Sequence, residues 1–316
     1  MPGTPARLAA LVVACSLAAG GALVACGLQT DGLGSTGTAS GPSTGGSGGS
    51  STSPGSGGNG GAGDAGSEDA SPEAAPVDAR PPAYVSCLDW LTAEPGATSG
   101  VYDLIDTLGN IYPAYCDMVG DGSDGGDGGV AGGWTLAMKI DGHDTGALDY
   151  DDALWTNEVA LNAGQPDLDR NEAKLPSFWS VPMTELRVGM VEDTTTRWLV
   201  VPLAVAGGAV SLFYVIQNGA PQTTLGRGAW EGLLANGSLQ TQCAREGINA
   251  DGLVRIGIVA DDDGDCSSPD SFLGFGAVNA SKGPFTAPSP PSGNIAEWSP
   301  DHGDQTVTTF GYVMVR

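Results

Sequence analysis

The sequence has few basic residues. Of its 316 residues only 12 are Lys or Arg, against 37 Asp or Glu, which gives a formal net charge of −25. A chain with so little positive charge has no basic surface with which to neutralise phosphates, and this argues against nucleic-acid binding. It argues equally against docking on anionic lipid through a polybasic patch.

Side chains that carry common catalytic chemistry are also scarce. The chain has only two His residues, His143 and His302, which leaves little for His-based zinc or triad chemistry. It contains no G-x-S-x-G motif, no H-E-x-x-H motif and no nucleotide-binding glycine loop after a strand. His302, flanked by Asp301 and Asp304, could ligate a metal, but we expect no enzymatic activity.

Aromatic residues are absent from the first quarter of the chain. All seven Trp, seven Tyr and six Phe residues lie beyond Ala83, whereas residues 26–83 are nearly all Gly, Ser, Thr, Ala and Pro. Such a segment buries too little apolar surface to offset its ordering entropy. We therefore expect residues 26–83 to be a disordered linker and residues 84–316 to form one domain.

The first 25 residues have the pattern of a signal peptide. Arg7 precedes a largely apolar run that is shorter, and richer in Ala and Gly, than a strong transmembrane helix, although a single-span anchor is the alternative. The run ends in Leu23-Val24-Ala25-Cys26, which resembles the bacterial lipobox, in which the cysteine is lipidated and becomes the new N-terminus. Cys15 is a weaker alternative, because too little of the apolar run precedes it. We expect a lipid anchor at Cys26 that holds the protein to the bacterial cell envelope, at the outer membrane or cell surface.

Four further cysteines follow the linker. An even number of cysteines in an exported protein indicates disulfides, and the absence of C-x-x-C argues against a redox pair or a zinc knuckle. Four cysteines allow three pairings. The local pairing, which closes the shortest loops, is Cys87–Cys116 and Cys243–Cys266.

Hydrophobic patterning predicts mostly β structure. Residues 134–140 alternate large apolar side chains with smaller or polar ones, which is typical of a half-buried strand. Further strands are expected at 101–105, 112–118, 185–191, 198–206, 210–217, 253–260 and 307–316. Short helices are expected at 151–161, 170–178 and 230–235. Strands mixed with short helices and long loops indicate the α+β class.

Several short motifs follow one another in the order and spacing of a fibrinogen C-terminal-like domain. They are Ser86-Cys87, Ser99-Gly100-Val101-Tyr102, Tyr115-Cys116-Asp117-Met118 and Gly132-Gly133-Trp134-Thr135-Leu136. Residues 139–155 match the next segment of that family, and the C-terminal half resembles its bacterial, intelectin-like branch. The resemblance covers about residues 84–316. It implies a mixed, mostly antiparallel sheet with short helices and long loops, and two disulfides.

The densest acidic run begins at Asp261. Asp261, Asp263 and Asp265 alternate along it, and Asp270 follows shortly after. Calcium prefers several hard oxygen ligands on a turning chain. The family has a calcium site of the form D-x-D shortly before a cysteine, and this run resembles it. We therefore expect Ca²⁺ at these four aspartates, the alternative being an exposed acidic turn.

The resemblance also implies a ligand pocket near the calcium. Lectins of this kind bind acetylated sugars or exocyclic diols between aromatic walls. The corresponding candidates here are Phe272, Phe275, Trp298 and His302. We expect a lectin-like head that binds glycans or acetylated ligands with calcium support. The alternative is a structural or adhesion module that binds a surface protein.

Overall fold

The structure is a computed structural model that describes residues 84–120, 132–144, 146–203, 207–219, 222–264, 268–279 and 283–316. These residues belong to one compact unit, Glu73–Arg316. The expected signal peptide, the lipidation site Cys26 and the linker lie outside the described residues, and so do Asp265 and Cys266. Within the described ranges, no helix is long and apolar enough to span a membrane.

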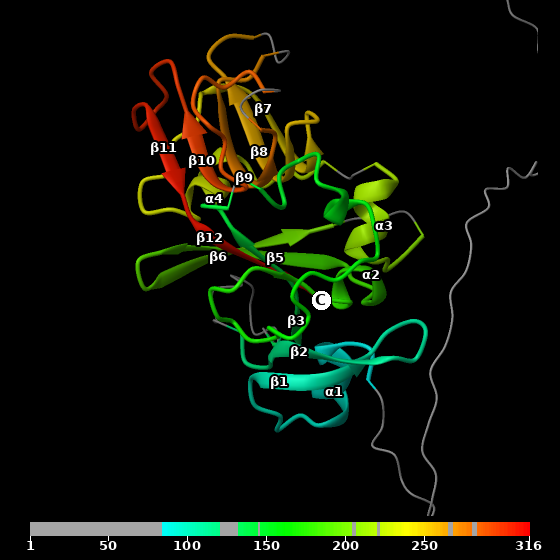
Figure 1. Ribbon diagram of the computed structural model, residues 1–316. Coiled ribbons are helices and arrows are strands. Elements are labelled where there is room, and N and C mark those ends of the chain that lie inside the picture. The colour runs from blue at the N-terminus through cyan, green and yellow to red at the C-terminus, as the bar shows by residue number, and fades with distance from the viewer. Residues whose placement is uncertain are drawn as a thin grey trace, which may run out of the picture. The chain divides into compact units, whose positions relative to one another are not determined.

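The larger of the two sheets in the described residues has seven strands, in the order β1-β2-β3-β12-β5-β6, with β4 paired to β3 (Figure 1). Its strands are β1 (Gly100–Ile105), β2 (Ile111–Asp117), β3 (Trp134–Asp141), β4 (Ala173–Lys174), β5 (Glu185–Glu192), β6 (Thr195–Pro202) and β12 (Phe310–Val315). All their pairings are antiparallel. The C-terminal strand β12 therefore lies at the centre of this sheet, between β3 and β5.

The second sheet has five strands, in the order β11-β10-β9-β8-β7. Its strands are β7 (Gln242–Ala250), β8 (Val254–Asp261), β9 (Ser271–Ala277), β10 (Ser292–Ala296) and β11 (Gln305–Thr308). A single residue, Thr309, separates β11 from β12, so one residue connects the five-stranded sheet to the seven-stranded sheet (Figure 1). Phe275 of β9 packs over Gly311 of β12, where a Cβ atom would clash with its ring.

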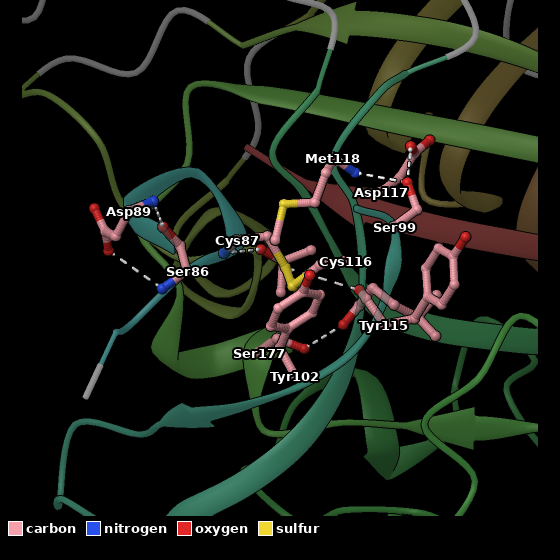
Figure 2. Close-up of a disulfide and its surroundings, with 12 residues drawn as sticks. Ser86, Cys87, Asp89, Ser99, Tyr102, Tyr115, Cys116, Asp117, Met118 and Ser177 are labelled. Atoms are coloured by element: carbon pink, nitrogen blue, oxygen red, sulfur yellow. Dashed lines mark hydrogen bonds between the residues drawn. A yellow bond between two sulfur atoms is a disulfide. The ribbon is translucent and has the colours of Figure 1, made fainter. Parts of the chain in front are cut away.

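The helices are short. They are α1 (Cys87–Ala93), the 3-10 turn η1 (Ala153–Trp155), α2 (Ser177–Ser180), α3 (Leu212–Gln217) and α4 (Arg227–Glu231). A capping box starts α1: the Ser86 hydroxyl accepts the Asp89 N–H, and the Asp89 carboxylate accepts the Ser86 N–H (Figure 2). The expected mostly antiparallel architecture with short helices is confirmed.

A disulfide joins α1 to β2. Cys87 and Cys116 form the bond that the local pairing predicts, and both are fully buried (Figure 2). The Cys87 N–H also donates to the Thr135 hydroxyl of β3 at 3.0 Å. Cys243 is disulfide-bonded as well, and its expected partner Cys266 lies outside the described residues.

Some expected elements differ from the structure. Residues 210–217 were expected as a strand, but α3 forms there, because the Ser211 hydroxyl caps the Tyr214 N–H and a short apolar run fits a buried helix equally well. The expected helix at 170–178 is replaced by β4 and the start of α2, and only η1 forms within 151–161. Strands β7, β9 and β10 were not predicted. Every residue of β9 and β10 is buried, so neither strand has the polar alternation that reveals a half-exposed strand.

Replacing Cys87 and Cys116 together by Ala should lower the free energy of unfolding by about 3 to 4 kcal/mol, because the bond closes a long loop in the unfolded chain. The two cysteines are 29 positions apart. Guanidinium unfolding followed by Trp fluorescence measures the change. An unchanged unfolding midpoint in the variant would contradict this role for the disulfide.

Candidate functional site

One end of the five-stranded sheet gathers the polar side chains of interest. In the strand registers, Ala260 of β8 lies opposite Ser271 of β9, Ser271 opposite Ala296 of β10, and Ala296 opposite Gln305 of β11. The end of β8, the start of β9, the end of β10 and the start of β11 therefore meet at this edge. The loops that extend beyond it carry both the acidic run and Trp298.

Four carboxylates converge beyond β8 and β9, and we call Asp261, Asp262, Asp263 and Asp270 the acidic cluster. The ligand oxygens of the first three lie within 4.8 Å of one another. Asp261 is only 2% exposed, whereas Asp262 and Asp263 are exposed. This arrangement brings hard oxygen ligands together, as calcium requires.

Two carboxylates of the acidic cluster, those of Asp261 and Asp270, have raised pKa values. Burial raises the pKa of Asp261, and the neighbouring Asp263 raises it further. Burial, followed by the charges of Asp261 and Asp262, raises the pKa of Asp270 to about 6. A divalent cation among these groups would relieve the repulsion.

The structure brings together three of the four aspartates that the sequence indicated as calcium ligands. These are Asp261, Asp263 and Asp270, while Asp265 lies outside the described residues. Asp262 also belongs to the cluster, although it was not expected as a ligand because only every second residue of the run was selected. The reason is that β8 ends at Asp261 and the chain bends, so strand alternation no longer separates neighbouring side chains.

A surface pocket lies beside the acidic cluster at the same end of the sheet. We call it the Trp298 pocket; its volume is about 420 Å³, and it is lined by Thr286, Ala296, Glu297, Trp298, Asp304, Gln305 and Thr306. Trp298 is 63% exposed, which is unusual for so large an apolar side chain. Trp298 and Ser299 both have positive φ, +64° and +63°, and the Ser299 N–H donates to the Asp304 carboxylate at 2.7 Å. This left-handed turn, rare for bulky residues, holds the indole at the surface.

Backbone and side-chain hydrogen bonds join the pocket to the acidic cluster and the start of β9. The Glu297 N–H donates to the Asp270 carbonyl at 3.1 Å. The buried Gln240 donates its side-chain amide to the Trp298 carbonyl at 2.9 Å, and its N–H to the Ser271 hydroxyl at 2.9 Å. One wall of the pocket is therefore attached directly to a residue of the acidic cluster.

His302 lies apart from the Trp298 pocket, since it is not among the lining residues. Its Nδ1 lies 2.6 Å from the Gly237 carbonyl, and its ligand atom is within 4.8 Å of those of Glu231 and Asp301. These three side chains could hold a metal, but Arg227 already pairs with Asp301 at 2.9 Å. The local charge is therefore partly balanced by the protein itself.

Phe272 and Phe275, expected as pocket walls, belong to the core. Both are fully buried. Phe272 packs against Phe285 with ring centroids 5.0 Å apart, and Phe275 lies between the two sheets. They support the strands that carry the site, and neither ring lines the pocket. Of the four residues expected to contact ligand, the structure places only Trp298 on a pocket wall.

Glu297, Asp304 and Gln305 are pocket residues that sequence reasoning missed. Glu297 directly precedes Trp298, and Asp304 lies two residues after His302, so both were close to indicated positions. These three residues come together because Ala296 of β10 pairs with Gln305 of β11, and this register could not be predicted from the sequence.

No protein-family model matches the chain, and a search of curated proteins finds no match either.

In a calcium chelator, Asp270→Asn should make the domain more stable at neutral pH. An acid whose folded-state pKa is raised from 3.8 to about 6 binds its proton more tightly in the folded state, so it costs stability as the pH rises through that interval. The neutral amide carries no such cost. The gain in melting temperature should be full above about pH 6 and should fade below about pH 4.

The matched control is Asp103→Asn, at an exposed position of β1 outside the cluster. Its melting temperature should follow that of the wild type across the same pH range. A gain for Asp270→Asn that does not depend on pH would show that packing, and not charge, is responsible.

Proposed function

We propose that residues 84–316 form a fibrinogen C-terminal-like recognition domain that binds glycans or acetylated ligands with the support of calcium. The motifs that carry the resemblance lie on consecutive paired elements. Ser99-Gly100 leads into β1, Tyr115-Cys116 belongs to β2, and Gly133-Trp134 leads into β3. The disulfide between Cys87 and Cys116 closes this N-terminal part of the domain.

The ion in this proposal is held by the acidic cluster. Its carboxylates supply several hard oxygens from two adjacent strand ends, and the pKa values of Asp261 and Asp270 are raised in the absence of a cation. Calcium binding would replace their mutual repulsion by attraction. The ion would thereby order the start of β9.

The observation that carries the proposal is the hydrogen bond from the Glu297 N–H to the Asp270 carbonyl. It connects a proposed calcium ligand to the residue that precedes Trp298. An ion that orders Asp270 would therefore also order the pocket wall. An exposed indole beside hydrogen-bonding side chains suits a sugar, which presents both an apolar ring face and hydroxyl groups.

The proposal includes a tether to a membrane. Lipidation of Cys26 would anchor the chain, and residues 26–83 would hold the head away from the surface of a bacterial envelope. On this account the protein is a non-enzymatic surface lipoprotein. Its partner would be a glycan or another surface molecule.

A second candidate function is adhesion to a protein partner. Apolar side chains of the β1–β2 hairpin are exposed, namely Val101, Leu108 and Ile111. The strand β1 is also an edge of the seven-stranded sheet. Exposed apolar groups on an edge strand are suited to contact another protein.

Calcium should raise the melting temperature of the protein relative to chelator, because an ion that binds only the folded state stabilises it. Replacing Asp261 and Asp263 together by Asn should abolish the increase, whereas Asp103→Asn should retain it. Differential scanning fluorimetry provides the measurement. An equal calcium response in all three proteins would place the ion elsewhere.

Trp298→Ala should weaken glycan binding by about tenfold or more, the loss expected when a stacking contact worth ~1.4 kcal/mol is removed. Tyr214→Ala is the matched control, because Tyr214 is 49% exposed on α3 and is not a pocket residue. Binding to an immobilised glycan array in calcium compares the two variants. Cell binding that survives Trp298→Ala and free sugars would favour the adhesion alternative.

A further inference from the structure

The described lining of the Trp298 pocket is acidic. Of the described residues that line it, Glu297 and Asp304 are carboxylates and none is basic. Among the ion pairs between described residues, none includes Glu297 or Asp304. The pocket therefore presents a negative potential to a ligand.

Hydrogen bonds fix the carboxylate of Glu297 in position. Its carboxylate accepts the Thr286 N–H, the Thr286 hydroxyl and the Ala287 N–H at 2.6 to 3.1 Å. The charge is thus part of a rigid wall.

Trp298 adds a second attraction for a cation. Its ring is exposed at the pocket, and its backbone carbonyl is held by the Gln240 amide. The face of an indole attracts an ammonium group, and it also stacks against the apolar face of a sugar ring. A cation between an aromatic face and fixed carboxylates is bound more tightly than at either alone.

The rest of the lining favours a sugar over a quaternary ammonium group. Recognition of quaternary ammonium uses a cage of several aromatic rings. Among the described lining residues, Trp298 is the only aromatic one, and Thr286, Gln305 and Thr306 are polar. Such side chains match the hydroxyl groups of a pyranose.

We propose that the Trp298 pocket binds an amino sugar whose amine is free and protonated, with the sugar ring against Trp298 and the ammonium group at the carboxylates of Glu297 and Asp304. The inference depends on the proposed glycan-binding function and names the ligand class. Sugars that carry carboxylate or phosphate are repelled by the same charge. An N-acetylated sugar keeps the stacking contact but loses the ionic one.

The test compares two ligands that differ only in acetylation, the β-1,4-linked glucosamine tetrasaccharide and its fully N-acetylated form. Calorimetric titrations of the full chain in calcium at about pH 6, where the amine is protonated, give both affinities. The free amine should bind about tenfold more tightly, and added salt should reduce this preference. Asp304→Asn and Glu297→Gln should each reduce it as well, whereas Asp103→Asn should leave it unchanged.

The outcomes distinguish failure of the amino-sugar inference from failure of the proposed glycan-binding function. Tighter binding of the N-acetylated sugar would overturn the inference and leave the proposed glycan function intact. Choline has an ammonium group but no sugar ring, so choline binding as tight as that of the amino sugar would overturn the inference that the pocket recognises a sugar. If neither tetrasaccharide binds, the inference fails, and the glycan array with Trp298→Ala decides separately whether the proposed function fails too. Thermal melts of Glu297→Gln and Asp304→Asn identify any loss that comes from unfolding.

Discussion

The rest of the structure depends on the hydrogen bonding of the C-terminal strand β12 between β3 and β5. All six of its residues are buried, and it joins the N-terminal strands β1, β2 and β3 to the hairpin of β5 and β6. Without it the larger sheet would divide into two parts with open edges. The last residues of the chain thus complete the core.

This constraint also positions the candidate functional site. Thr309 alone links β12 to β11, and the pocket loop lies between β10 and β11. Phe275 of β9 packs over Gly311, so the five-stranded sheet lies directly against the central strand of the other sheet. A rigid central strand supports the strand ends, and the loops beyond them are free to carry charged and exposed side chains.

Part of this arrangement could be predicted from the sequence, and part could not. The pattern from Trp134 onward and the apolar C-terminus located β3 and β12. Two details were wrong: β3 is buried on both faces except at its last residue, and the single strand expected at 307–316 is divided at Thr309 into the end of β11 and β12. Strands β9 and β10 were missed because burial on both faces removes the alternation. Phe272 and Phe275 of β9 were expected as pocket walls from the resemblance to lectins, but both are core residues. The acidic cluster was identified by composition, but the contribution of Asp262 and the pairing of Glu297 with Asp270 depend on tertiary register.

We propose that the acidic cluster and the Trp298 pocket act together. Linkage requires that if calcium supports ligand binding, the ligand must strengthen calcium binding by the same factor. The direct measurement is a calorimetric titration of calcium into the chelator-stripped protein, with and without a saturating bound glycan. We expect a lower calcium dissociation constant when the ligand is present, and loss of that difference in Trp298→Ala. Identical dissociation constants with and without ligand would contradict it.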